Sequence, residues 1–124
     1  MTAKRYSDLI VWQKAMNLVE TVYKITKTFP KEETYGLSGQ LRRAAVSVPS
    51  NIAEGHSRTG RREFAHYLSM AHGSLSEVET QVEIALRLGY ITEQEREQVF
   101  QSSAEVGRIV VGLIRSLEKH VAAS

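Results

Sequence analysis

The sequence predicts an all-α protein, an up-down-up-down four-helix bundle whose second helix is kinked at Pro49. Apolar residues recur three and four positions apart along four successive segments of the 124-residue chain, which is the spacing of one helix face. The connections between these segments are short, as in bundles whose neighbouring helices run antiparallel. With only two prolines and few glycine-rich turns, the chain has little room for β-hairpins.

The composition is that of one globular domain spanning residues 1–124. Hydrophobic residues make up 42% of the chain and charged residues 24%, a balance typical of a packed core rather than of disorder. The absence of cysteine excludes disulfides and thiolate metal sites. The sequence shows no signal-peptide pattern and no apolar run of about 18 residues. We therefore expect a cytoplasmic protein without a membrane segment.

The first helix is expected to begin after an N-cap at Ser7 or Asp8 and to run to about Thr28, before Phe29 and Pro30. It carries two apolar seams, one of Leu9, Trp12, Met16, Val19 and Tyr23, the other of Val11, Ala15, Leu18, Val22, Ile25 and Phe29. Together the seams are wider than the stripe of about 100° that packs on a single core. They predict a further apolar partner, and hence a closed homo-oligomer.

The second helix is expected to start near Glu32 and Glu33, whose carboxylates suit the positive end of a helix. It should then pass through the central stretch of the chain, from Gln40 onwards, and end at Gly55. A glycine at that position is typical of a left-handed C-cap residue.

Pro49 lies inside the apolar pattern of this second helix. A proline there removes the amide donor to the carbonyl of Ala45 and costs about 3 kcal/mol in a regular helix. Because the apolar phase is unbroken from Val48 to Ile52, we expect a kink rather than a break. The side chains expected to bond the freed carbonyls are those of Ser47, Ser50 or Asn51.

A third helix is predicted from Thr59 or Gly60 to Leu88, followed by Gly89 as a left-handed terminator. Its apolar residues alternate four and three apart without a break: Phe64, Leu68, Ala71, Leu75, Val78, Val82 and Ala85. The sequence Thr92-Glu93-Gln94-Glu95 is a capping box and should open the fourth helix.

Charge is distributed unevenly around the second and third helices. Residues 42–62 hold five arginines against one glutamate, a net charge of +4, and residues 63–86 hold four glutamates and no basic residue. The five arginines are Arg42, Arg43, Arg58, Arg61 and Arg62. They could contact phosphates of a nucleic acid. Alternatively, they could pair with Glu77, Glu79 and Glu83 within or between subunits and stabilise the oligomer.

No constellation of catalytic or metal-binding residues is complete. Glu63 and His66 have the spacing of a di-metal bundle site, but the chain offers no second Glu-x-x-His. His72 and Glu79 are two turns apart on one helix, about 10 Å, which is too far for a direct acid–base pair. Nucleophile motifs and phosphate-binding glycine loops are also missing. We expect no metal, no cofactor and no enzymatic activity.

Several stretches together resemble a known bacterial family, the 23S rRNA intervening-sequence proteins. They are Leu9-Ile10-Val11-Trp12-Gln13-Lys14-Ala15, Phe29-Pro30, Tyr35-Gly36-Leu37, residues 40–55, Glu63-Phe64, Gly73-Ser74 and Glu79-Thr80-Gln81. The resemblance spans residues 6–118 in order, and the central stretch, residues 40–55, is its most specific part.

The resemblance implies a four-helix bundle that assembles as a homopentamer. The family is similar to the accessory variability determinant of diversity-generating retroelements, a basic pentamer associated with nucleic acid and a reverse transcriptase. The resemblance therefore favours an accessory protein with RNA or DNA as its ligand and a reverse transcriptase or another protein as partner, and it strengthens the interpretation that the five arginines contact phosphates. The alternative is a structural or protein-interaction module whose arginines hold the oligomer together. No catalytic residue is carried over.

Overall fold

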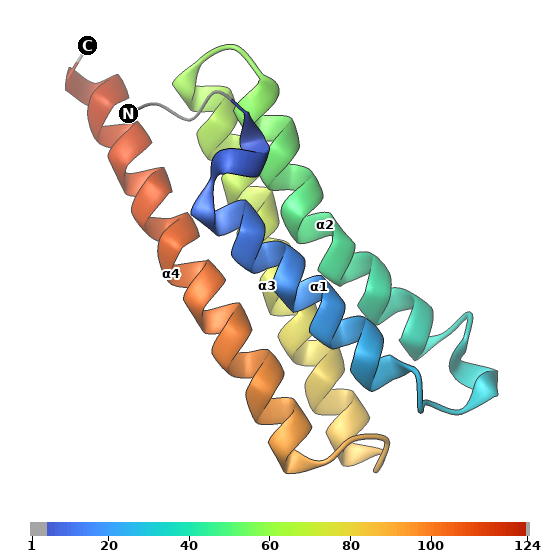
Figure 1. Cartoon of the computed structure of the whole chain (residues 1–124). Coiled ribbons are helices and arrows are strands. Elements are labelled where there is room, and N and C mark those ends of the chain that lie inside the picture. Colours follow the sequence, from blue (N-terminus) through green and yellow to red (C-terminus); the bar gives the residue numbers. More distant parts are fainter. Residues whose placement is uncertain (1–4, 124) are drawn as a thin grey trace.

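Four helices pack antiparallel around one apolar core in the computed structural model, which describes residues 5–123 and side chains as far as Lys119 (Figure 1). The elements are η1 (Tyr6–Asp8), α1 (Ile10–Thr26), η2 (Lys31–Glu33), α2 (Leu37–Ser57), α3 (Arg61–Arg87) and α4 (Glu93–Ala123). Helices α1 and α3 each contact both α2 and α4. The predicted all-α four-helix bundle is confirmed. Within residues 5–123, no helix is both long enough and apolar enough to cross a membrane.

The core is built from the apolar seams that the sequence displays. On α3, six of the seven seam residues are buried and Phe64 is partly buried. On α1, the seam from Val11 to Ile25 is buried throughout, and Phe29, just after the helix, is buried as well. Burying such side chains supplies most of the favourable free energy of folding, because apolar surface is removed from water.

The second seam of α1 is covered in part by the chain itself. Leu9, Trp12 and Val19 are half-buried against the core, and the ring of Tyr6 in η1 meets Trp12 edge-on at 5.4 Å between centroids. Tyr23, by contrast, is 40% exposed. The bundle therefore buries part of this second seam itself, so less of the seam is exposed to a further partner than the sequence suggested.

Helix α1 also begins later than predicted. Its N-cap is Leu9 rather than Ser7 or Asp8, because both predicted residues lie in η1. There the carboxylate of Asp8 accepts the backbone amide of Arg5 at 3.3 Å. The helix ends at Thr26, close to the predicted boundary.

Helix α2 begins at Leu37, so the expectation that Glu32 and Glu33 open it is wrong. Both acids lie in the separate one-turn helix η2. Glu33 nevertheless serves the start of α2, because its carboxylate accepts the amide of Leu37 at 3.0 Å and the hydroxyl of Tyr90 at 2.9 Å. One side chain thus ties η2, α2 and the turn between α3 and α4 together.

These two bonds to Glu33 predict a pH-dependent stability. They lower the pKa of its carboxyl below the ordinary value of 4.5, the amide of Leu37 more than Tyr90. Because the folded pKa is the lower one, the stabilisation is present above the unfolded pKa and is lost as pH falls through the folded pKa. We expect Glu33→Gln to destabilise the protein at neutral pH and to match the parent in acid. Urea unfolding of both proteins across this range measures the difference, and a pH-independent gap would contradict the assignment.

Pro49 is buried inside α2, and the helix continues through it without dividing at Val48. The prediction that this proline does not end the helix is confirmed. The bonding around Pro49 differs from the prediction. The side-chain amide of Asn51 donates to the backbone carbonyl of Ser47 at 2.8 Å rather than to that of Ala45. Asn51 also donates to the hydroxyl of Ser47, which in turn shares a hydrogen bond with Ser74 across to α3.

Gly55 is not a left-handed C-cap, contrary to the prediction; it lies buried within α2, and the helix ends at Ser57. A Cβ placed on Gly55 would lie 2.6 Å from the Cβ of Tyr67 and 3.1 Å from a ring carbon of Phe64. The residue is therefore glycine because α3 passes very close to α2 at this point.

The remaining boundaries agree with the sequence. Gly60 caps α3 with a φ of 102°, and Gly89 follows its C-cap with a φ of 78°. At the start of α4, the amide of Glu95 donates to the hydroxyl of Thr92 at 3.1 Å, and the amide of Thr92 donates to the carboxylate of Glu95 at 2.9 Å. This reciprocal pair is the predicted capping box.

Candidate nucleic-acid interface

The five predicted arginines fall into two groups at opposite ends of α2. Arg42 and Arg43 lie in its first half, Arg58 directly follows its last residue, and Arg61 and Arg62 open α3. At a rise of about 1.5 Å per residue, positions 42 and 58 are about 24 Å apart along the helix. The fold therefore does not bring all five side chains together.

Arg42 is held against α1. Its Nε donates to the hydroxyl of Thr26 at 2.8 Å, and its guanidinium carbon lies 4.6 Å from the centre of the Tyr23 ring. Thr26 is itself buried and donates to the carbonyl of Val22 at 2.8 Å. The contacts of Arg42 are those of a residue that joins two helices of the bundle.

Arg43 faces a different neighbour. It lines a polar groove between α2 and α3, together with Glu77 and Gln81. Its guanidinium lies over Gly39, where a Cβ would be 3.1 Å from an Nη atom of Arg43. The side chain is exposed and forms no ion pair with the residues that the structure describes.

Arg58 is anchored on both sides. It pairs with Glu54 one turn earlier at 3.0 Å, and its guanidinium carbon lies 5.3 Å from the centre of the Tyr67 ring. The hydrogen bond that Arg58 donates to the carboxylate of Glu54 is the main reason that the pKa of Arg58 is raised, so this side chain stays charged. Since both partners are largely exposed, the pair adds little to stability.

Arg61 and Arg62 occupy the first turn of α3. Both are exposed, and neither forms an ion pair within the described part of the chain. Gly60 provides no side-chain cap for the first amides of this helix. Cations at a helix N-terminus are unfavourable by roughly 0.3–1 kcal/mol each, so helix stability does not explain these arginines. An anion bound at this helix start would be attracted by the positive end of the helix and by the positive charge that these two side chains add there.

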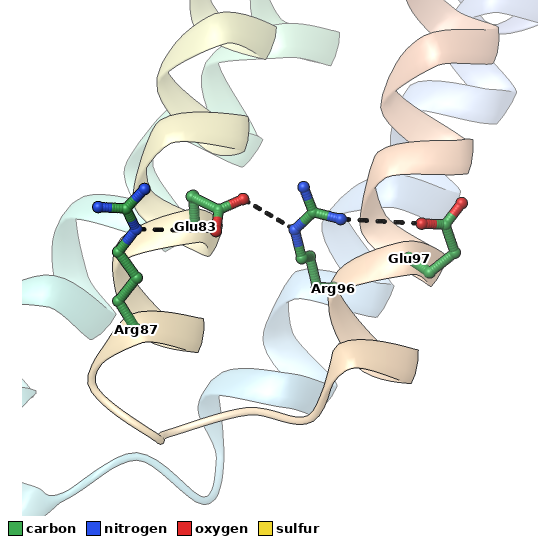
Figure 2. Close-up of polar contacts among 4 residues, drawn as sticks. All are labelled: Glu83, Arg87, Arg96 and Glu97. Atoms are coloured by element: carbon green, nitrogen blue, oxygen red, sulfur yellow. Dashed lines mark hydrogen bonds and ion pairs between the residues drawn. The ribbon is translucent and has the colours of Figure 1, made fainter.

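Two acidic residues of α3, Glu79 and Glu83, bind side chains of α4 and none of the five arginines. Figure 2 shows Glu83 between Arg96 of α4, at 2.8 Å, and Arg87, at 4.0 Å, with Arg96 also 3.9 Å from Glu97. Glu79 accepts the hydroxyl of Ser103 at 2.6 Å. No ion pair joins the five arginines to Glu77, Glu79 or Glu83 among the side chains that the structure describes, so the alternative of pairing inside one subunit is wrong for them. Pairing between subunits stays a prediction.

Two residues with prominent roles were missed in the sequence. Arg96 pairs with Glu83, and its guanidinium carbon lies 4.3 Å from the centre of the Phe100 ring. The turn at Gly89 could have indicated this pair, because the two positions lie six and seven residues from it. Tyr67 had no such signal, since its position beside Arg58 depends on how α3 packs against α2.

The histidine–acid pairs do not assemble a metal site. Glu63 and His66 are both exposed, and His72 and Glu79 line a groove between α3 and α4. Among the residues that the structure describes, no three histidine, aspartate or glutamate side chains lie close enough to hold a metal ion.

Comparisons with known proteins identify a family and a solved structure that this chain resembles. A family model described as 23S rRNA-intervening sequence protein matches residues 7–112. The 1.70 Å crystal structure of a protein of unknown function from the S23 ribosomal protein family, from Bacteroides thetaiotaomicron, is similar with a TM-score of 0.79. The two chains are 24% identical, and the match covers 86% of this chain and 96% of that one. No curated protein matches the sequence. At this identity, the likeness between the two structures concerns the fold alone.

Proposed function

We propose that this chain, which belongs to the 23S rRNA-intervening sequence protein family, is a non-catalytic, oligomeric accessory protein that binds RNA or DNA. The proposed contact surface is the basic end of the bundle, formed by Arg58, Arg61 and Arg62. Arg43, at the other end of α2, adds a separate contact.

The observation that carries this proposal is the pair Arg61 and Arg62. Two adjacent, exposed guanidinium groups stand at a helix N-terminus, where they oppose the helix dipole and have no acidic partner among the described residues. Arginine side chains commonly donate hydrogen bonds to the phosphate oxygens of a nucleic-acid backbone. Arg42 is left out of the proposed surface, because its side chain is half-buried against Thr26 and Tyr23 of α1, whereas the other four arginines are exposed.

We also propose that the protein forms a closed ring, with five copies as the expected number. Helix α1 supports this, since Ile10 is 69% exposed, Tyr23 is 40% exposed and Met16 is only half-buried. A ring would repeat the basic end around its axis, so that weak contacts add by avidity. Static light scattering at micromolar concentration is expected to give a mass well above one chain. A monomer would rule out the ring. If the ring forms, a partner protein such as a reverse transcriptase would bind the assembled ring.

The salt dependence of binding tests the arginines directly. Log affinity for a duplex should fall linearly with log salt, by about 0.9 for each phosphate neutralised. The double variant Arg61→Ala, Arg62→Ala is expected to reduce that slope by up to about 1.8 per subunit engaged, because two contacts are lost. Fluorescence anisotropy of a labelled oligonucleotide over a series of salt concentrations measures the slope.

A matched control removes the same charge elsewhere. Lys24 and Lys27 are exposed near the C-terminal end of α1, so replacing both by alanine should leave the slope close to that of the parent. If the parent protein does not bind at low salt, the proposed function is wrong. If the arginine variant dissociates into monomers, the arginines stabilise the oligomer and the protein is an interaction module.

A further inference from the structure

A shallow groove on α2 lies directly beside the basic end of the bundle. It has a volume of about 580 Å³ and is lined by Tyr6 and Tyr67 together with Ser50, Asn51, Glu54 and Ser57 of α2. Ser57 is the last residue of α2, and Arg58, which follows it, lies with its guanidinium over the ring of Tyr67 in the lining of the groove. None of these groove residues was singled out as a binding site from the charge pattern.

Two separate packing features bring tyrosines to this groove. Helix η1 packs on α2, as Figure 1 shows near the α2–α3 turn, and carries Tyr6 there with its ring against Trp12. On α3, the close approach at Gly55 places Tyr67 beside the last turns of α2. Both tyrosines are half-buried, so each side chain is held by the fold while part of it remains accessible.

Each tyrosine is accompanied by an arginine. The guanidinium carbon of Arg58 lies 5.3 Å from the centre of the Tyr67 ring, and that of Arg5 lies 6.0 Å from the centre of the Tyr6 ring. The one acid in the lining of the groove, Glu54, forms an ion pair with Arg58 at 3.0 Å through one of the two Nη atoms of the guanidinium. Aromatic rings combined with arginine are the pairing by which proteins bind unstacked bases and the phosphates between them.

The α2 surface between the tyrosines offers small polar groups. Ser50 and Ser57 are exposed, and their hydroxyls have no hydrogen-bond partner among the described side chains. The amide nitrogen of Asn51 is committed to Ser47, which leaves its carbonyl oxygen as an acceptor. These groups can bond to base edges without selecting one base strictly.

We propose that this groove binds unpaired bases of single-stranded nucleic acid, with Tyr6 and Tyr67 as stacking surfaces. The inference rests on the proposed function, because Arg58, Arg61 and Arg62 supply the adjoining phosphate contacts. Bases in a duplex keep their faces stacked on one another, so only an unpaired strand can use the tyrosines. The continuity of the groove with the basic end favours a nucleic acid over a protein as its occupant.

The test compares two strands that carry the same phosphates. Labelled oligothymidylate and an abasic strand of equal length are titrated into the unaltered protein and followed by fluorescence anisotropy at several salt concentrations. Loss of stacking should weaken binding of the abasic strand by roughly 5- to 150-fold per base contacted, while the salt slope stays the same. Because no residue is changed, this comparison does not depend on whether a variant folds.

Variants then assign the effect to the tyrosines. Tyr67→Leu and Tyr6→Leu should each weaken binding of oligothymidylate without altering its salt slope, whereas Tyr67→Phe and Tyr6→Phe should keep the affinity, because the ring remains. Circular dichroism confirms that each variant is helical, and light scattering reports its oligomeric state.

The outcomes separate this inference from the proposed function. Equal affinity for the two strands, together with a reduced slope in the Arg61/Arg62 variant, would overturn the groove proposal and leave the arginine interface standing. A leucine variant that changes the oligomeric state while both strands bind equally would show that the groove is a protein interface. An absence of binding to any strand at low salt would remove both proposals.

Discussion

Replacing Leu68 by alanine is expected to lower the free energy of unfolding by about 2–5 kcal/mol, because it removes a large side chain from the centre of the core. Leu68 is 0% exposed and belongs to the uninterrupted seam of α3. The substitution removes apolar contacts and leaves a cavity that neighbouring helices fill only in part. A domain of this size is stabilised by about 5–15 kcal/mol in total, so the loss would be a large share of it.

Leu88 provides the matched control for this substitution. It caps the same helix and is 54% exposed, so Leu88→Ala should change stability by no more than about 0.5 kcal/mol. Urea unfolding monitored by circular dichroism gives both values. Equal losses in the two variants would mean that the seam of α3 does not form the core.

Replacing Gly55 by alanine is expected to destabilise the protein by about 1–3 kcal/mol, although alanine is the better helix former. The added methyl group would lie 2.6 Å from the Cβ of Tyr67 and 3.3 Å from the backbone oxygen of Phe64. Neither atom is the far end of a flexible side chain, so α2 and α3 would have to separate at this point. The separation should also displace Tyr67 from its place beside Arg58.

Gly73 is the control that isolates this contact. It lies within α3, and a Cβ on it would meet no atom within 4 Å. Gly73→Ala should therefore stabilise the protein by about 1 kcal/mol through helix propensity alone. Thermal unfolding of the two variants should shift the midpoint in opposite directions. If Gly55→Ala also stabilises the protein, the helices are not in the close contact described.

The first helices show where reading the sequence locally fell short. The acids Glu32 and Glu33 satisfied the rule for a helix start, yet they lie in η2, and Glu33 reaches forward to the amide of Leu37. Gly55 satisfied the rule for a helix end, yet it lies within α2. In both cases the residue also contacts one that is distant in the sequence. Glu33 accepts the hydroxyl of Tyr90, and Gly55 lies against Tyr67. The local sequence pattern does not show these contacts.

In the candidate site too, some features of the arginines could be predicted from the sequence and others could not. That Arg61 and Arg62 open a helix follows from their neighbours in sequence, and the structure places them in the first turn of α3. That Arg42 binds Thr26 while Arg43 faces α3 does not follow, because adjacent residues on a helix point about 100° apart and meet different neighbours. The charge count of a segment therefore overstates how many arginines can serve one ligand.

By itself, the sequence determined the four α-helices, their core faces and the turn at Gly89, but not the one-turn helices η1 and η2, because periodicity and capping depend on residues within one or two turns. Only the tertiary structure decided that Glu79 and Glu83 bind Ser103 and Arg96 of α4, and that Tyr6 and Tyr67 flank one groove. These contacts join residues far apart in the chain. They arise from the directions in which four helices pack, and no local pattern records those directions.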